Sequence, residues 1–413
     1  MDNKELIPNL FRTEYSKMVA VLCKTFGLSN IEIAEDVVSE TFLKAAETWG
    51  VKGIPENPTA WLYQVAKNSV KDLFKRKQVF DNKIVPEFQS VSAYTFSEFD
   101  FSEENINDSL LRMIFVICHP KLSVDSQVPL ALRILFGFGI DEIATALLSN
   151  KDSINKRLFR AKNNLKENHL ELESVSEKEI EARLNSVLSV LYLLFNEGYF
   201  SFAAKEKIRK DLCLEAIRLA HLLTKMPVTN KPDVNALLAL FCFQASRFDA
   251  RIGLSGEQIL YDHQNMEDWN QELIEMGSYY LSLSSSNAPL SKYLLEAMIA
   301  YWHTQKLTDE RQKWDNILQL YNRLLQKHYS PIIALNRTYA LAKVKGNREA
   351  LKEAQKIKLE NNPLYHSLLS ELYISIDEQK RDEHLKIAIQ FTKNESDKLL
   401  LKQKLKKASK EHN

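Results

Sequence analysis

Glycine and proline are scarce in this chain of 413 residues, which contains only 10 glycines and 11 prolines. Because these two residues interrupt regular structure, their scarcity argues against β-rich folds with many tight turns and against low-complexity disorder. Net charge is also nearly absent, at +1. Any binding to nucleic acid must therefore come from local basic patches and not from the charge of the whole molecule.

Cysteine is scarce too, and its spacing excludes the common zinc motifs. Cys23, Cys118, Cys213 and Cys242 lie far apart, with no CxxC pair and no Cys/His cluster at metal-ligand spacing. His119 follows Cys118 directly, and neighbours at i and i+1 cannot bind a metal from one helix face. We therefore expect reduced thiols and no metal site.

Long apolar runs and catalytic motifs are missing as well. No stretch of 18 apolar residues occurs, and the N-terminus lacks the apolar core of a signal peptide. There is no P-loop, no glycine-rich dinucleotide motif, no HExxH and no nucleophile elbow. These absences predict a cytoplasmic protein without membrane contact, enzymatic activity or cofactor.

The stretch 139–167 carries the clearest positive signal. It predicts a helix-turn-helix whose second helix is apolar on one side, with Ile154, Leu158, Ala161 and Leu165 at i, i+4, i+7 and i+11. Ser149 is the expected N-cap. The opposite side is basic and amide-rich, as a helix in the DNA major groove requires, although a solvated basic face would show the same pattern.

Two blocks upstream add to this signal. In residues 34–46, an acidic stripe that includes Asp36 and Glu40 surrounds an outward leucine, Leu43, which suits a basic and partly apolar partner. In residues 60–77, a basic run is interleaved with aromatic residues and Asn68, behind a helix start at Asn57 and Pro58. Phosphate neutralisation, stacking and edge hydrogen bonds of this kind suit single-stranded DNA. Solvated helix faces are the alternative in both cases.

The three blocks, AEDVVSETFLKAA, AWLYQVAKNSVKDLFKRK and GIDEIA…SINKRLFRAK, occur in an order and at separations that resemble the extracytoplasmic-function group of sigma factors of the sigma-70 family. The resemblance covers about residues 8–170. It implies an all-α protein that recruits core RNA polymerase and opens promoter DNA without bond chemistry. The implied domains are region 2 at 1–83, an acidic flexible linker at 84–107 and region 4 at 108–170.

The resemblance also implies roles for individual residues. Docking on the polymerase β′ clamp falls to Asp36, Glu40, Phe42 and Leu43, although Phe42 could equally belong to the core. Reading of the −10 element, with a flipped base, falls to Trp61, Asn68, Lys71 and Arg76. Reading of the −35 element, in a domain that also contacts the β flap, falls to Ser153, Asn155, Lys156, Arg157, Arg160 and Lys162.

The remaining chain forms a helical extension, which we divide at 171–285 and 286–413. Five positions recur at a displacement of 34 residues, the tetratricopeptide period: Leu335/Leu369, Tyr339/Tyr373, Glu349/Glu383, Leu351/Leu385 and Ala354/Ala388. The block LYLLFNEGY…LCLEAIRLA…NALLAL resembles the DUF6596-type extension of some of these sigma factors. Such an extension would control sigma activity and offer a surface for a protein or peptide partner. The alternative is that it only supports the two DNA-binding domains structurally.

A second interpretation stays open. The chain could be a DNA-binding regulator with a helix-turn-helix and tetratricopeptide repeats that never acts as a sigma subunit. That interpretation leaves the blocks between residues 34 and 77 without a role.

Overall fold

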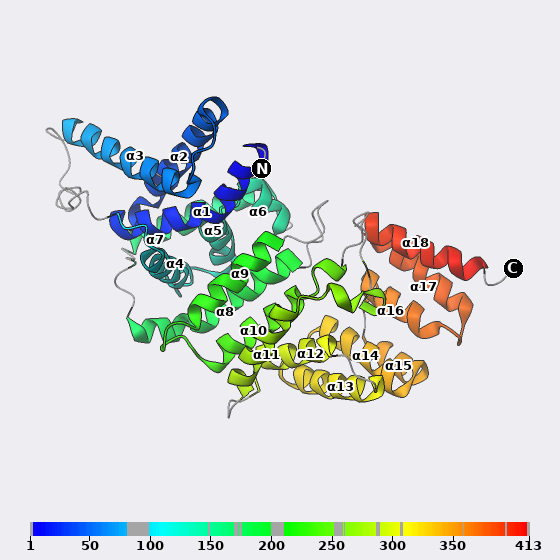
Figure 1. Ribbon diagram of the computed structural model, residues 1–413. Coiled ribbons are helices and arrows are strands. Elements are labelled where there is room, and N and C mark those ends of the chain that lie inside the picture. The colour runs from blue at the N-terminus through cyan, green and yellow to red at the C-terminus, as the bar shows by residue number, and fades with distance from the viewer. Residues whose placement is uncertain are drawn as a thin grey trace. The chain divides into compact units, whose positions relative to one another are not determined.

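The computed structural model describes residues 3–80, 99–147, 149–168, 172, 176–199, 210–251, 259, 261–285, 290–305, 309–357, 359–392 and 395–410. Every regular element in these ranges is a helix (Figure 1), which confirms the all-α prediction. None of these helices combines the length and apolarity needed to cross a lipid bilayer. The chain forms two compact units, one of residues 1–198 and 214–229 and one of residues 199–213 and 230–413.

The first unit is built from eight α-helices and part of a ninth, among the residues described. They are α1 (Asn3–Phe26), α2 (Ile31–Lys52), α3 (Pro58–Phe80), α4 (Glu103–Ile117), α5 (Val124–Phe136), α6 (Ile140–Ala146), α7 (Lys151–Glu167), α8 (Glu177–Tyr199) and α9 (Lys210–Leu223). A single 3₁₀ turn, η1 (Leu28–Asn30), joins α1 to α2. This unit contains both segments predicted to read DNA.

Helix α1 lies at the centre of the first unit. It contacts α2 and α3 on one side and α4 and α5 on another. Its residues Tyr15, Met18 and Leu22 are accordingly inaccessible to solvent. The region expected as 108–170 therefore shares a core with the region expected as 1–83, and the two do not stand apart.

Gly137 allows α5 to approach α1 closely. It ends α5 in the left-handed conformation, with φ 64°. A β-carbon at this position would lie 3.2 Å from the ring of Tyr15. Glycine thus meets a conformational and a steric requirement at once.

The helix starts show where local prediction succeeded and where it failed. Asn57 accepts a hydrogen bond from the backbone N–H of Ala60, as the predicted cap of α3 should. The cap of α7 is Asn150, which accepts from Ser153 N at 2.8 Å, so the prediction of Ser149 was wrong. Helix α4 begins at Glu103 behind a Ser102 cap, inside the stretch predicted as a flexible linker. The part of that linker before residue 99 lies outside the described residues.

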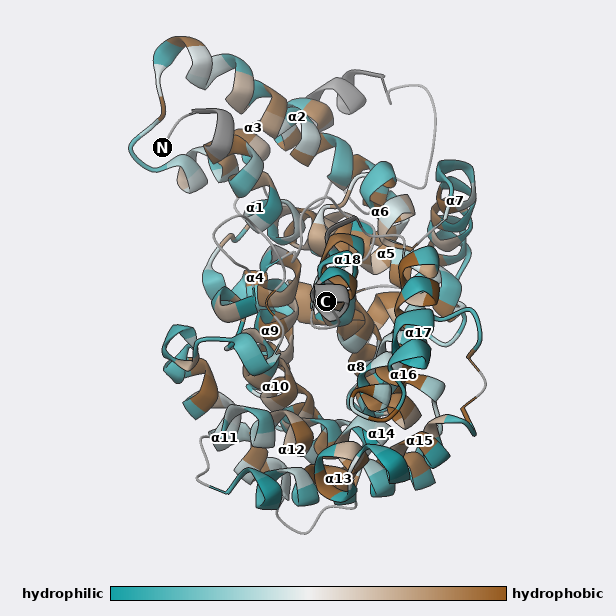
Figure 2. Ribbon diagram, turned by 90° about the vertical axis from the view of Figure 1, so that its right-hand side faces the viewer, coloured by the Kyte–Doolittle hydropathy of each residue, from teal (hydrophilic) through white to brown (hydrophobic). Residues whose placement is uncertain are grey.

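The second unit consists of helices that follow one another in contact along the chain. They are α10 (Pro232–Ala245), α11 (Gln271–Ser285), α12 (Lys292–Thr304), α13 (Glu310–Lys327), α14 (Pro331–Lys345), α15 (Asn347–Ala354), α16 (Pro363–Tyr373), α17 (Glu378–Phe391) and α18 (Glu395–Lys410). Helix α10 is buried along nearly its whole length and is mostly apolar (Figure 2).

The pairs displaced by 34 residues occupy equivalent places in this stack. Leu335 of α14 and Leu369 of α16 are both buried, as are Ala354 of α15 and Ala388 of α17. Leu351 and Leu385 are buried as well, whereas Glu349 and Glu383 are both exposed, so the period brings core and surface positions into the same register.

Candidate nucleic-acid interface

Helix α7 is anchored through its apolar stripe. The four predicted stripe residues, Ile154, Leu158, Ala161 and Leu165, are all buried. The helix rests on α5 and α6. Its anchoring leaves the opposite face available, and that face carries the residues predicted to read DNA.

Most of the predicted base and phosphate contacts on α7 are accessible. Asn155, Lys156 and Arg160 are exposed, and Ser153 and Arg157 are half-buried. Within the part of the chain that the structure describes, the side chains of Lys156, Arg157 and Arg160 form no ion pair. Unpaired cations beside an amide on one helix face can bind phosphate and base edges.

Lys162 is placed differently from the other predicted contacts. Its Nζ donates to Glu35 Oε2 of α2 at 2.5 Å, and 17% of its side chain is exposed. Glu35 Oε1 also accepts from Tyr15 at 3.0 Å and from Arg133 of α5 at 2.8 Å. In this structure Lys162 therefore neutralises a buried carboxylate and does not face solvent with its neighbours.

A second ion pair joins the same two helices one turn further along. Lys166 Nζ lies 2.8 Å from Glu32 Oε2. The hydrogen bond from Lys166 lowers the pKa of the Glu32 carboxyl below its ordinary value. The C-terminal half of α7 is thus tied to α2 by two lysines.

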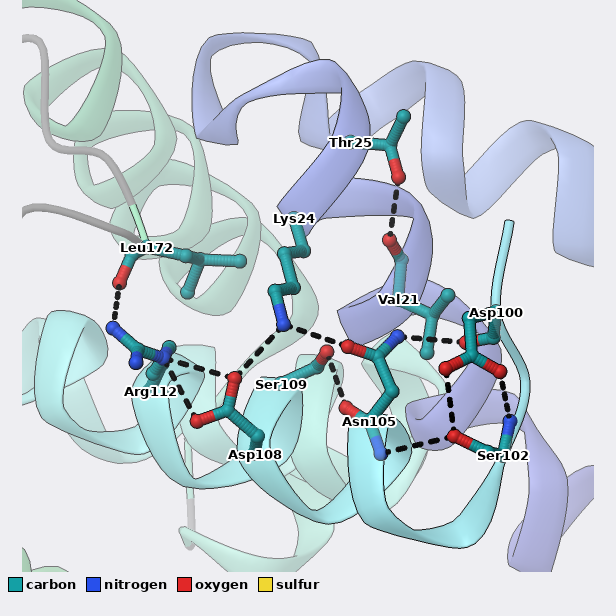
Figure 3. A network of polar contacts seen from close by, with 10 residues as sticks. All are labelled: Val21, Lys24, Thr25, Asp100, Ser102, Asn105, Asp108, Ser109, Arg112 and Leu172. Carbon is teal, nitrogen blue, oxygen red and sulfur yellow. Dashed lines mark hydrogen bonds and ion pairs between the residues drawn. The ribbon is translucent and has the colours of Figure 1, made fainter. Parts of the chain in front are cut away.

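The contact between α1 and α4 is polar as well (Figure 3). Lys24 Nζ donates to Asn105 at 2.6 Å and to Asp108 at 2.8 Å. Asp108 also accepts from Arg112, which reaches the carbonyl of Leu172. Burial alone would raise the pKa of Asp108, but the hydrogen bonds from Lys24 and Arg112 hold that pKa below its usual value.

The residues of α3 that were predicted to bind the −10 element differ in their exposure to solvent. Asn68 is exposed and accepts from Gln64 Nε2 at 3.2 Å, while Lys71 is half-buried. Trp61 is half-buried and meets Trp49 of α2 edge-to-face, with ring centroids 5.3 Å apart. The side chain of Arg76 lies outside the described residues.

Phe101 makes a contact on α3 that sequence reasoning missed. Its ring stacks on Tyr63, with centroids 4.6 Å apart, and Lys67 lies 5.6 Å from its centroid. Tyr63 also donates to Glu14 of α1 at 2.5 Å. The only signal in the sequence was the alternation of Phe99 and Phe101 with polar residues in a stretch assigned to the linker.

Helix α2 exposes the predicted acidic stripe. Asp36 and Glu40 are exposed, and 60% of Leu43 is accessible. Phe42 is buried, with 5% exposed, and meets Phe11 edge-to-face at 5.0 Å. Phe42 therefore belongs to the core beneath the stripe, so its assignment as a surface contact needs correction.

Comparison with known proteins agrees with this geometry. Residues 11–79 match the sigma-70 region 2 family, and residues 183–285 match a family of unknown function, DUF6596. An uncharacterized protein of Rhizobium meliloti is 30% identical over 345 residues, which are 82% of this chain and 81% of that protein. These matches support a relationship of this chain to the sigma-70 family.

The stretch that matches sigma-70 region 2 comprises most of α1 together with α2 and nearly all of α3. The match to region 2 supports binding to core RNA polymerase and to promoter DNA, and therefore a sigma-factor-like role in transcription initiation. Members of the sigma-70 family are transcription regulators and not enzymes. Helix α7 lies outside both matched ranges. No solved structure matches the chain.

Two observations in the described ranges bear on the expected absence of a metal site and of reactive thiols. No group of three or more His, Cys, Asp or Glu residues could hold a metal ion there. The side chains of all four cysteines are buried. Burial raises the pKa of Cys242 to about 12, which keeps that thiol protonated and unreactive at neutral pH.

Proposed function

We propose that this protein is a sigma factor of the extracytoplasmic-function type, which recruits core RNA polymerase and recognises −10 and −35 promoter elements. One observation carries the proposal: a sigma-70 region 2 whose α2 and α3 present an acidic stripe and a polar, basic face side by side. Helix α2 contacts α3 within the same unit.

Core polymerase docks, in this proposal, on the outward stripe of α2, at the β′ clamp. Asp36 and Glu40 supply exposed charge, and Leu43 supplies an apolar contact that is 60% exposed. A large exposed leucine flanked by carboxylates suits a partner that is basic at its rim and apolar at its centre. Phe42 acts from below, where it holds the helix against α1.

Promoter −10 DNA binds along α3. Asn68 is placed to hydrogen-bond a base edge, and Lys71 is near enough to the surface to reach a phosphate. Trp61 supplies a partly accessible aromatic surface, and Arg76 is assigned a phosphate by resemblance. Taking a base out of the duplex costs on the order of a few kcal/mol, which stacking and phosphate contacts offset.

The −35 element binds on α7. Asn155, Lys156 and Arg160 are the residues with open access, and Ser153 and Arg157 lie beside them. Lys162 joins this set only after it leaves Glu35. The domain that contains α7, residues 108–170, would also contact the β flap.

The second unit acts as a regulatory extension in this proposal. Its stacked helix pairs and the 34-residue period support a tetratricopeptide-like surface for a protein or peptide partner. The match to DUF6596 over residues 183–285 begins in α8 of the first unit and continues to the end of α11 in the second. Occupation of the surface would then control initiation.

Run-off transcription tests the proposal. Purified core polymerase is combined with the full chain and a promoter library, with the Asp36→Arg and Arg160→Ala variants as internal tests. The full chain is used because Arg183 of α8 bonds the carbonyl of Phe115, so truncation after residue 170 would uncover α4. Initiation that depends on the protein supports the sigma function, whereas promoter binding without initiation or core binding would favour the regulator that is not a sigma subunit.

A further inference from the structure

Three buried nitrogen atoms of the second unit have no hydrogen-bond partner in the described chain, and all three belong to side chains around Tyr261. They are Nε of Arg247, Nε1 of Trp269 and Nδ1 of His303. The Arg247 guanidinium lies 5.3 Å from the centre of the Tyr261 ring, and the rings of His303 and Trp269 lie 5.0 and 6.3 Å from that centre. Buried polar atoms are rarely left without a partner, so such a group indicates a bound ion, water or ligand.

The charge around Tyr261 is not balanced within the described residues. Lys313 is 1% exposed, and its Nζ donates to the Tyr261 hydroxyl at 2.9 Å and to Glu310 Oε1 at 3.3 Å. Arg247 has no carboxylate partner in that part of the chain, where its polar contacts are the Tyr261 ring and the hydroxyl of Tyr199, at 3.4 Å. The cluster therefore carries one positive charge without a counter-ion.

The state of His303 agrees with a positive potential at this place. Burial, together with the cations Arg247 and Lys313, lowers the pKa of His303 to about 3, so its imidazole is neutral at neutral pH. The potential that disfavours a proton on His303 favours an anion beside it. A neutral imidazole can donate from Nδ1, and an indole nitrogen only donates. The unpartnered acceptors of the same stretch, Oε1 of Gln244 and of Gln264, are uncharged and leave the sign of the potential unchanged.

We propose that the second unit binds a small anion, through a carboxylate or a phosphate, between Arg247, Trp269 and His303. The guanidinium gives such an oxyanion a charge-assisted hydrogen bond, and the two neutral donors complete its contacts. Water would satisfy the same donors but would leave the charge of Arg247 uncompensated. The three residues follow α10, precede α11 and lie in α12, so one ligand joins three parts of the helical stack. None of them is proposed to bind DNA or polymerase, and the site does not depend on the sigma function.

Isothermal titration calorimetry of the full chain tests the site. The protein is titrated with inorganic phosphate in one series and with malonate, a dicarboxylate, in another, both at constant ionic strength with chloride as the reference anion. We expect saturable binding of a single anion per chain in at least one series. The series with the tighter binding identifies whether the ligand group is a phosphate or a carboxylate. Absence of saturable binding in both series overturns the proposal.

Arg247→Gln removes the charge that has no counter-ion. Loss of a hydrogen bond from a charged group should weaken binding of the anion by about tenfold or more. Arg348→Gln is the matched control, because Arg348 of α15 is exposed and forms no ion pair in the described structure. We expect this control to bind as the wild type does. Equal weakening in both variants, or none in Arg247→Gln, overturns the site, because surface charge would then hold the anion.

Trp269→Phe covers the case in which Arg247→Gln does not fold. It keeps an aromatic ring at a residue that is 4% exposed and leaves every charge in place, so the main loss at the site is the unpartnered N–H. We expect binding of the same anion to weaken by about two- to tenfold. Unchanged affinity in every folded variant rejects the site. Run-off transcription is a separate measurement, so anion binding without initiation removes only the sigma function, and initiation without anion binding removes only the site.

Discussion

Replacing Gly277 by alanine should destabilise the second unit. Gly277 lies in α11 against Phe243 of α10, and a β-carbon there would lie 2.8, 2.9 and 3.1 Å from three ring atoms. Phe243 is fully buried, and Tyr301 of α12 meets its ring edge-to-face at 5.7 Å. The ring cannot yield without displacing Tyr301, so α11 must move away from α10.

The expected magnitude follows from two opposed terms. Overpacking of a rigid core costs about 1–3 kcal/mol. Alanine in place of glycine inside a helix increases the stability of that helix by roughly 0.5–1 kcal/mol. The net loss is about 0–2.5 kcal/mol, with a central value near 1 kcal/mol, and each kcal/mol lowers the melting temperature by roughly 2–4 °C for a unit of this size.

Gly50→Ala is the matched control. Gly50 lies inside α2, and no atom is within 4 Å of where its β-carbon would be. Only the greater helix propensity of alanine applies here, so the free energy of unfolding of the first unit should rise by about 0.5–1 kcal/mol. Differential scanning calorimetry of the full chain measures both variants. A Gly277→Ala protein that is as stable as the wild type or more stable would refute the tight contact between α10 and α11.

Four further outcomes are expected. Arg160→Ala should weaken promoter binding about tenfold and lower the salt slope by about 1, with core polymerase affinity unchanged in a pull-down titration. Asp36→Arg should weaken core binding about tenfold while free DNA binding stays the same. Burial, together with the nearby cations Arg247 and Lys313, lowers the pKa of His303 to about 3. The free energy of unfolding of the second unit should therefore fall by about 1.4 kcal/mol per pH unit as the pH decreases from about 6.5 towards 3. His303→Asn should abolish that decrease, as measured by urea titration at each pH. Because the folded pKa of Asp108 is lowered, its stabilising contribution is full above about pH 4 and lost below; Asp108→Asn should flatten the acid limb of the stability curve.

The first three of these outcomes each have a contrary result that is easy to recognise. Equal loss of DNA and core binding in Arg160→Ala would point to misfolding and remove Arg160 from the DNA face. Unchanged core affinity in Asp36→Arg would remove α2's outward stripe from the polymerase interface. A His303→Asn protein with the same acid sensitivity as the wild type would show that another group titrates in the second unit.

Much of the site could be read from the sequence because helical periodicity is a local property. The stripe of Ile154, Leu158, Ala161 and Leu165 was buried as its spacing required. The outward position of Asp36, Glu40 and Leu43 followed from the same 3.6-residue period. Burial of Phe42 could not be settled, since that depended on whether Phe11 of another helix lay against it.

The capping error has a local physical reason. Ser149 and Asn150 are both good N-cap residues, and they differ by one position. The backbone of Asn150 is extended while its side chain accepts from Ser153 N, so the helix begins one residue later than expected. Periodicity fixes which face of a helix is apolar, but it leaves the terminus uncertain by a residue or two.

The sequence by itself determined the helical class, the amphipathic faces and the resemblance to sigma-70 region 2, because each depends on residue types at fixed short spacings. Only the tertiary structure decided that Glu35 lies within reach of Tyr15, Arg133 and Lys162, residues 20, 98 and 127 positions away. An acidic residue between Ala34 and Asp36 looks like any solvated charge until the fold buries it. The long-range ion pairs between α2 and α7 depend on the shared core around α1, and no local pattern encodes that core.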